Sequence, residues 1–410
     1  METKHNFKET ISAFRDAIQD ELDRNILGFW ASHAVDEKHD GFIGRMSNTN
    51  RIEAKAPKGL ILNTRILWTF SVAYRVSGKT QYLELAQRAL AYLKEHFLDS
   101  EHGGLLWLLD HQGRLLDDKK RIYGQAFAIY ALAEYYRATN DTEELQLAKN
   151  LFSLIETRAR DSVHLGYLET YNRDWSIADE LRLSEKDMDV AKSMNTHLHL
   201  LEAYTNLYRI WKDDLLRQRL NELIMIFQTH IINESNHHFI LFFDEQWQPQ
   251  SDGISFGHDI EGSWLLTEAA EVLGIESVAD CVNEAAVAIA RATLQEAFQL
   301  DGGLLYEAGP EGARDTDRHW WPQAEAVVGF LNTYQLTEEQ PFLEAALKCW
   351  AYIQQHIIDS QRGEWYWKVS REGIPDMEEP KVSQWKGPYH NSRMCFEVLA
   401  RLEIIAASDL

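Results

Sequence analysis

The stretch Gly103-Gly104-Leu105-Leu106-Trp107-Leu108 carries the pattern that decides the fold, because it recurs along the chain. It consists of a turn, usually glycine-containing, then an alternating aromatic and aliphatic run, then a polar turn. Counterparts occur at residues 40–45 (DGFIGR), 166–171 (GYLETY), 238–244 (HFILFFD), 302–307 (GGLLYE) and 363–368 (GEWYWK). The copies are roughly 60–70 residues apart, which is longer than the common short solenoid repeats. Strand-like alternation closed by turn residues predicts a short β-hairpin at each copy.

Between the copies the apolar spacing becomes helical. Ile66, Leu67, Phe70 and Tyr74 share one helix face, and a second helical pattern covers residues 82–93 after the break at residues 77–79 (SGK). The same helix–break–helix unit returns after residues 123, 195, 260 and 321. Each unit therefore predicts two helices of ordinary length and one hairpin.

One unit per copy predicts six helical pairs. Pairs that bury a face only against their neighbours can close into a ring. We therefore expect an all-α (α/α)6 barrel with short β-hairpins at the rim, forming a single domain over residues 1–410. An open superhelix of pairs is the alternative, but it has no need of the aromatic hairpins.

Composition narrows the classes of function. The formal net charge of -23 argues against nucleic acids and anionic membranes as partners. Thirteen Trp, 16 Tyr and 17 Phe, many beside polar residues, suit sugar binding. Three cysteines without CxxC spacing indicate a reducing, cytoplasmic location. The polar N-terminus predicts no signal peptide, and no apolar run approaches the roughly 20 residues of a membrane helix.

Two polar segments carry candidate acid/base residues. In GHDIEGSW (residues 257–264), His258, Glu261 and Trp264 fall on one side of an expected helix start, with Asp259 near the N-cap. In GPYHNSR (residues 387–393), His390 lies at the start of the last helix, where the helix dipole favours the neutral imidazole that a general base requires. A structural His–Glu pair and an ordinary capping segment are the competing interpretations.

Four further segments place polar or aromatic residues at inner helix starts. In MNTHLH (residues 194–199), Asn195 and His199 are four apart and share a face, whereas His197 points elsewhere. Because partner ligands at a familiar spacing are missing from the sequence, we expect no metal site. Trp321 and Glu325 also share a face. The segments 63–68 (NTRILW) and 123–127 (YGQAF) supply Arg65 and Tyr123.

Seven segments together resemble the N-acylglucosamine 2-epimerase superfamily, and most of all its cellobiose 2-epimerase branch. The resemblance runs in order through nearly the whole chain, and GHDIE followed by WWPQAE and GPYHN is its most specific part. The segments are RILWTFS (65–71), YGQAFAIYALAEYY (123–136), MNTHLHLLEAY (194–204), GHDIEGSWLL (257–266), DGGLLYE (301–307), HWWPQAEAVVGF (319–330) and KGPYHNSRMCFE (386–397).

The resemblance implies an (α/α)6 barrel and a set of site residues. Two histidines, His258 and His390, would be the acid/base catalysts on C2 of an open-chain aldose, with His199 as a third catalytic histidine. Residues that would contact the substrate are Arg65, Tyr123, Asn195, Glu261, Trp321, Glu325 and Trp385, to which the helical spacing adds Trp264. Trp385 would hold the non-reducing sugar, and Arg65 would lie near the substrate oxygens.

The expected reaction inverts C2 of the reducing-end glucose of β-1,4-linked disaccharides such as cellobiose or lactose. Proton transfer through a cis-enediolate needs two bases and no change of oxidation state, so we expect no cofactor. Mannobiose 2-epimerase, N-acylglucosamine 2-epimerase and an aldose–ketose isomerase are the alternatives within the family. Outside it stand an inverting glycoside hydrolase on the same barrel and a non-catalytic sugar-binding ring. We expect a monomer or weak dimer.

Overall fold

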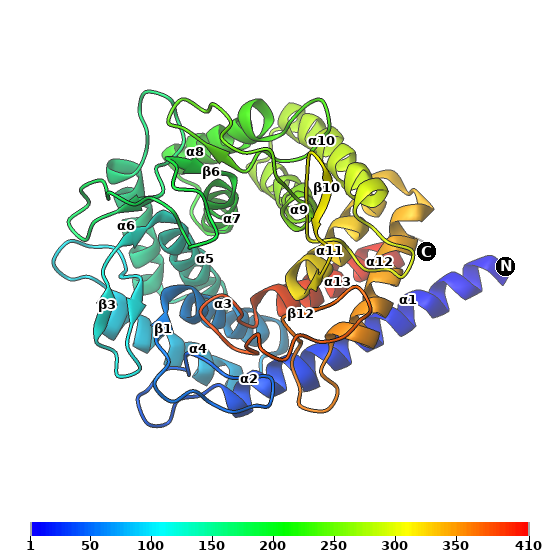
Figure 1. The fold of residues 1–410 in the computed structure, drawn as a ribbon, viewed down its shortest axis with the longest axis horizontal. Helices are drawn as coiled ribbons and strands as arrows, with labels where there is room; N and C mark the ends of the chain where they lie inside the picture. The colour runs from blue at the N-terminus through cyan, green and yellow to red at the C-terminus, as the bar shows by residue number, and fades with distance from the viewer. Residues whose placement is uncertain (1, 409–410) are drawn as a thin grey trace.

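Helices form two concentric layers around a central opening (Figure 1). The computed structural model describes the backbone of residues 2–408 and the side chains of residues 7–407. The inner layer consists of α3 (Leu60–Ser77), α5 (Ile122–Thr139), α7 (Met194–Ile210), α9 (Phe256–Leu273), α11 (Trp320–Thr337) and α13 (Tyr389–Ser408). The outer layer consists of α1 (Glu2–Asp20), which η1 (Glu21–Leu27) and α2 (Gly28–His33) continue, α4 (Thr80–Tyr92), α6 (Thr142–Arg158), α8 (Asp214–Ile226), α10 (Glu276–Glu296) and α12 (Gln340–Tyr352).

The inner helices close into a complete ring. Each packs against the next, and the last contact joins α13 to α3. Five pairs consist of an inner helix and the outer helix that follows it, whereas the sixth is formed by α13 and α1, from opposite ends of the chain. The predicted (α/α)6 barrel is confirmed, and the open superhelix is excluded. Among the helices of residues 2–408, none is long and apolar enough to cross a membrane.

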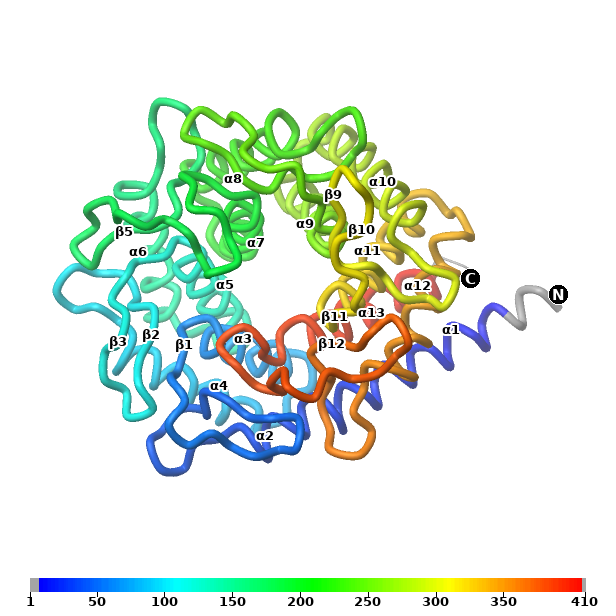
Figure 2. The backbone as a smooth tube through the Cα atoms, in the orientation of Figure 1, coloured from blue at the N-terminus to red at the C-terminus, as the bar shows by residue number. Residues whose placement is uncertain are grey.

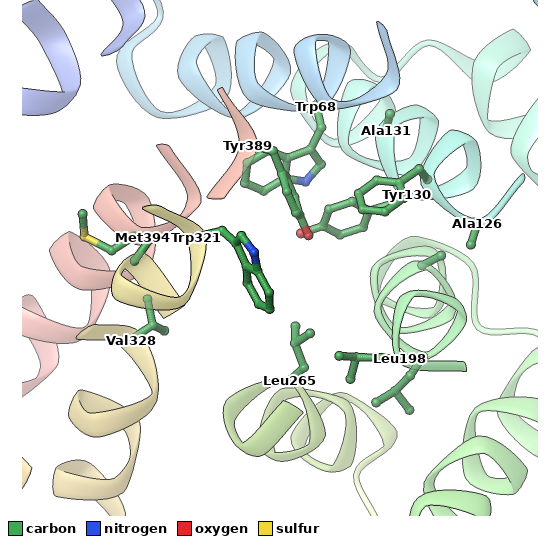
Figure 3. Packing of buried hydrophobic residues seen from close by; sticks show 14 of the residues in the cluster. Trp68, Ala126, Tyr130, Ala131, Leu198, Leu265, Trp321, Val328, Tyr389 and Met394 are labelled. Atoms are coloured by element: carbon green, nitrogen blue, oxygen red, sulfur yellow. The ribbon is translucent and has the colours of Figure 1, made fainter. Parts of the chain in front are cut away.

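The inner and outer helices have different hydrophobic patterns in sequence because they are buried to different extents. In α3, every residue from 60 to 73 is buried, because an inner helix meets two inner neighbours and an outer one. The outer helix α4 buries only a stripe that includes Tyr82, Ala86, Ala89 and Leu90. Gly78 separates the two helices as predicted: its φ of 68° is left-handed, which suits glycine at a helix C-terminus. Figure 3 shows how buried side chains of neighbouring inner helices meet, with Trp68, Tyr130 and Tyr389 gathered together.

Three of the outer helices end in a short π-helical turn before the rim. These turns are η2 (Leu93–Phe97), η3 (Phe227–Ile231) and η4 (Ile353–Ile357), which follow α4, α8 and α12.

Short antiparallel strands connect neighbouring units at the end of the ring where the inner helices begin. The paired strands are β1 (Lys58–Gly59) with β2 (Leu108–Leu109), β2 with β3 (Leu115–Asp117), β4 (Lys120–Arg121) with β5 (Thr170–Tyr171), β6 (Lys192–Ser193) with β7 (Phe242–Phe243), β8 (Ile254–Ser255) with β9 (Glu307–Gly309), β9 with β10 (Gly312–Asp315), and β11 (Arg318–His319) with β12 (Lys368–Val369).

The strand pairing confirms the predicted hairpins and adds a second partner. The segments turn back on themselves, as between Leu109 and Leu115 or between Tyr171 and Ile177, and five of the six also pair with the two residues that precede the previous inner helix, as Leu108–Leu109 does with Lys58–Gly59. A single bridge, such as that between Leu98 and Leu105, ties each segment back to the end of its outer helix. The strands therefore fix the spacing between neighbouring units at the end of the barrel where the inner helices begin.

Buried ion pairs reinforce this end. Four lysines that precede an inner helix reach back to an aspartate at the end of an outer helix, with Nζ–Oδ2 distances of 2.7–2.8 Å. The pairs are Lys58–Asp36, Lys120–Asp99, Lys192–Asp161 and Lys381–Asp359. Arg318 takes the lysine's place before α11, and in the fourth unit Ile254 and Asn233 replace both partners. All four lysines are almost completely buried.

Candidate active site

A cavity of about 820 Å³ opens at the end of the barrel where the inner helices begin. Its wall includes side chains from all six inner helices and from the segment between β12 and α13, which lies over α3 in Figure 2. Nine of the residues predicted from the sequence line it: Arg65, Tyr123, Asn195, His199, His258, Glu261, Trp321, Trp385 and His390. Residues from separate sequence motifs therefore meet at one cavity, as their positions in the sequence predicted.

The repeat explains why they converge. The sixth residue of each of α3, α5, α7, α9 and α11 is Arg65, Phe127, His199, Glu261 and Glu325. In α13, which begins at Tyr389, Arg393 is the fifth residue. Equivalent positions in a ring of parallel helices lie at one depth. Four of the five sixth-position side chains are ionisable, which no solvent-facing helix surface explains.

His390 is held by a carboxylate. Its Nδ1 lies 2.7 Å from Glu325 Oε1, and the other Glu325 oxygen accepts the indole N–H of Trp264 at 3.1 Å. Burial, and then the positive charges of Arg65 and Arg393, lower the pKa of His390 well below its usual value. The imidazole is therefore neutral, and the Nδ1–H tautomer that Glu325 favours leaves Nε2 free to accept a proton.

His258 is held by a hydroxyl instead. Ser255 Oγ lies 2.7 Å from His258 Nδ1, so the N-cap serine of α9 contacts a side chain instead of a backbone amide. Desolvation, followed by the charge of His199, lowers the pKa of His258 to about 3. The rings of His258 and His390 both lie beside one indole, with centroids 4.7 Å and 5.5 Å from that of Trp321. Figure 3 shows Trp321 pointing inward from α11.

His199 and Asn195 both face the cavity, as their helical spacing predicted. His199 Nδ1 lies 3.0 Å from Glu202 Oε2, and the ring packs against Phe127 and Tyr123 with centroids 4.7 Å and 4.9 Å away. His197 points away, as predicted: its Nε2 accepts the amide of Tyr167 at 3.0 Å, in the core.

Arg65 is the cation on the cavity wall that faces these groups. Its guanidinium donates to Tyr123 Oη at 3.0 Å and to the carbonyl of Trp385 at 2.8 Å, and it lies 4.7 Å from the Phe127 ring. Its Nε has no hydrogen-bond partner among the described residues. Fixed contacts on both sides therefore hold a positive charge at the wall, which suits a developing anion.

Two predicted substrate contacts lie behind the cavity wall. Trp264 and Glu325 are buried and do not line the cavity: the indole N–H of Trp264 donates to Glu325, which in turn contacts His390. The pair therefore holds His390 from behind the cavity wall. Asp259 is likewise no helix cap: it is the fourth residue of α9 and accepts from the amide of Phe239 at 2.8 Å, with His238 Nδ1 2.7 Å away.

Sequence reasoning missed several functional positions. Arg393 and Glu202 each lie three residues beyond a catalytic candidate, which places them on the same helix face, and Ser255 lies three residues before His258. That spacing was the available signal. Four other side chains on the cavity wall are not spaced three residues from a catalytic candidate: Tyr306, His319, Trp320 and Trp367.

Glu261, Glu325 and His390 bring three potential metal ligands within 4.8 Å of one another. Nη2 of Arg393 already occupies this space: it donates to Oε1 of Glu261, and to Oε1 of Glu325 at 2.7 Å. Burial, then repulsion by Glu325, raises the pKa of Glu261 to about 7. The guanidinium of Arg393 balances these carboxylates and fills the space between them, so the donor set does not fit a divalent cation.

The sequence profile of N-acylglucosamine 2-epimerase matches residues 41–391. The chain belongs to this family. Membership of this family agrees with the closed ring of helices and with the cavity at its end. The chain is 45% identical over 386 residues to the cellobiose 2-epimerase of Bacteroides fragilis, with 94% of this chain and 98% of that one aligned.

Solved structures extend the comparison. The cellobiose 2-epimerase of Bacillus thermoamylovorans B4167 superposes with a TM-score of 0.91 at 39% identity, covering 95% of this chain and all of that one. The α-1,6-mannanase of Salegentibacter sp. HEL1_6 superposes with a TM-score of 0.62 at 13% identity, covering 93% of this chain and 99% of that chain, which shows a common fold alone. This 2-epimerase family member is an isomerase.

Proposed function

We propose that the protein reversibly epimerises C2 of the reducing-end glucose of β-1,4-linked disaccharides, converting cellobiose to glucosyl-mannose and lactose to epilactose. The observation that carries this proposal is the pair of neutral histidines, His258 and His390, beside Trp321 in one cavity. Both have lowered pKa values, and a neutral imidazole is the form that removes a proton.

Groups on the cavity wall can accept and donate every proton that the reaction moves. Ring opening passes the O1 proton to one histidine, while O5 takes the proton that Glu261 can carry near neutral pH, where its pKa lies. The second histidine removes H2, and the electron pair of the C2–H bond forms the C1=C2 bond of a cis-enediolate. The first histidine then protonates the opposite face of C2. Ring closure returns one proton to O1 and the other to Glu261.

Charge at the end of the barrel favours the intermediate. The enediolate carries a negative charge on oxygen, and Arg65 presents a fixed guanidinium on the wall. The inner helices also point their N-termini at the cavity, where the positive end of each helix dipole stabilises an anion. His199, fixed by Glu202, would hold O1.

The size of the cavity supports an oligosaccharide as substrate over a monosaccharide. About 820 Å³ lies within the range of small-molecule sites, and half-buried Trp385 adds an aromatic surface at its wall. An inverting hydrolase is disfavoured, since its carboxylates stand roughly 6.5–9.5 Å apart with water between them, whereas Glu261 and Glu325 share one guanidinium. We further propose that the protein acts in the cytoplasm as a monomer or weak dimer; its three free cysteines support that compartment.

Incubation with cellobiose and with lactose in D₂O, followed by NMR, tests the proposal. The expected products carry mannose in place of the reducing-end glucose, with deuterium at C2. Epimer that retains only protium at C2 would contradict exchange through the two histidines. A ketose as the sole product would point to the aldose–ketose isomerase instead.

A further inference from the structure

Arg393 lies at the centre of the buried polar groups behind the cavity. The residue is 1% exposed and does not line the cavity. One guanidinium nitrogen contacts Glu325 Oε1 at 2.7 Å and Glu261 Oε1, and the other contacts Glu202 Oε1 and the hydroxyl of Tyr389. A single guanidinium therefore meets three carboxylates that come from three different helices.

Two of these carboxylates also hold a histidine on the cavity wall. Glu325 lies 2.7 Å from His390 Nδ1, and Glu202 lies 3.0 Å from His199 Nδ1. No hydrogen bond from Nε2 of either ring to another described residue is present. Each imidazole is thus fixed on its buried side and open on its cavity side.

We propose that Arg393 is a positioning residue that sets the tautomer of His199 and His390 together, through Glu202 and Glu325. In this arrangement both carboxylates stay anionic and accept Nδ1–H. Both Nε2 atoms then face the substrate as proton acceptors. The inference deepens the proposed epimerase reaction and relies on it only for its kinetic consequence.

Loss of the guanidinium has a specific chemical result. Burial already raises the pKa of Glu325, and the charge of Arg393 opposes that rise. Without Arg393, the three neighbouring carboxylates repel one another in a desolvated space, and protonation relieves the repulsion. A protonated carboxyl group donates to Nδ1, which moves the imidazole proton to Nε2. A histidine in that tautomer can no longer accept a proton from C2.

Imidazole NMR measures the tautomers directly. Long-range ¹H–¹⁵N spectra of protein with ¹⁵N-labelled histidines distinguish Nδ1–H from Nε2–H without any substrate. We expect wild-type protein to show Nδ1–H at His199 and His390, assigned with His199→Gln and His390→Gln, and Arg393→Met to show Nε2–H at both. In the cellobiose assay, kcat should fall about 100-fold, as for loss of one acid/base function, with KM within about threefold because Arg393 does not touch the cavity.

Arg219 provides a matched control. It contacts Glu156 Oε2 at 2.7 Å and Glu222 Oε2 at 3.2 Å, and Glu156 accepts from two tyrosines, but the group lies around the outer helix α8. Arg219→Met should leave both tautomers and kcat unchanged. Arg393→Lys keeps the charge and should retain more Nδ1–H and more activity than Arg393→Met.

The possible outcomes separate the two proposals. Nδ1–H retained at both histidines in folded Arg393→Met would overturn the positioning role, even if activity falls. If Arg393→Met does not fold, Arg393→Gln takes its place, and Nδ1–H retained at both histidines in that uncharged variant overturns the positioning role equally. A tautomer switch in a protein whose wild type epimerises no disaccharide would uphold this inference and reject the proposed function.

Discussion

His258 and His390 are held at Nδ1 by different groups, a serine hydroxyl and a glutamate carboxylate. A carboxylate stabilises the imidazolium that forms after proton abstraction, whereas a hydroxyl does so weakly. The same reaction run in either direction would therefore use two bases of unequal strength. We therefore expect kcat to differ between the two directions, while the free energies of the two sugars alone set the equilibrium.

Replacement of either histidine should abolish turnover. We expect His258→Ala and His390→Ala each to lose at least two to three orders of magnitude in kcat, the contribution of a positioned acid/base. His230→Ala, at a residue stacked on Trp247 away from the cavity, should keep full activity. Initial rates with circular dichroism spectra check this, and near-normal turnover in a folded variant would remove that histidine from the mechanism.

The acidic limb of the pH profile should lie at unusually low pH. A lowered pKa means that the neutral base is present above that pKa and is lost only when the pH falls through it. Since the pKa of His258 is about 3 and that of His390 is also low, kcat/KM should hold its value well below pH 6.5. A profile measured from pH 4 to 9 tests this over the range in which the protein stays folded, and a limb near 6.5 would contradict it.

Trp385 allows the disaccharide subsite to be tested. Its ring lies 5.9 Å from Trp107 and 6.2 Å from Tyr123, beside the carbonyl that anchors Arg65. Loss of a sugar stacked there should cost about 1 kcal/mol, the value of an aromatic stacking pair. We expect Trp385→Ala to lower kcat/KM for cellobiose much more than for glucose. An equal loss for both sugars, with a lower melting temperature, would show that Trp385 only packs the segment.

Several site residues could be predicted from single motifs because helical spacing is local. The shared face of Asn195 and His199 followed from counting along one helix, as did the outward direction of His197. The roles of Trp264 and Glu325 did not, since depth behind the wall depends on packing between α9, α11 and α13. Arg393 was overlooked because its three carboxylate partners lie on other helices.

At the scale of elements, the buried lysine–aspartate pairs fix where each inner helix begins. Lys381 is fully buried, with Nζ 2.7 Å from Asp359 Oδ2 and 2.7 Å from the carbonyl of Gly363. It anchors the segment that carries Trp385 and leads into His390. The placement of two site residues therefore depends on a contact outside the cavity.

Lys381→Met should destabilise the protein by about 3–5 kcal/mol, because it leaves Asp359 buried and unpaired. The double variant Lys381→Met/Asp359→Asn should recover most of that loss, since asparagine carries no charge and can still accept the amides of residues 361 and 362. Melting temperatures and urea midpoints of the three proteins measure the effect. A double variant no more stable than the single one would show that the charge is not the cause.

Helix boundaries were easier to predict than strand partners. The break at residues 77–79 is local, and Gly78 ends α3 there. The repeated segments also read as strands that turn back on themselves, but their second partner lies in the preceding unit, as Lys58–Gly59 does for Leu108–Leu109. Alternation alone predicts an extended run, and it carries no information about which neighbour supplies the pairing backbone.

At the scale of the whole molecule, the count of six repeats predicted the closed barrel but not how it closes. The sixth pair joins α1 to α13, and residues from the N-terminal helices reach the site through it: Trp30 Nε1 contacts Glu364 Oε1 at 3.3 Å, and Glu364 accepts from Asn391 at 2.7 Å, beside His390. A contact between chain ends has no periodic signature. Trp30 of α2 is nevertheless linked through Glu364 to Asn391, the neighbour of a candidate catalytic histidine.

The common depth of the sixth side chain in the inner helices bears on how such proteins diverge. Each of these positions is presented by its own helix, and in most units its own buried ion pair anchors that helix. A point mutation at Arg65, His199 or Glu261 can change the cavity wall while the backbone of the other five units stays in place. A protein named α-1,6-mannanase shares this fold at 13% identity. The ring therefore tolerates replacement of most of its residues while the fold is kept.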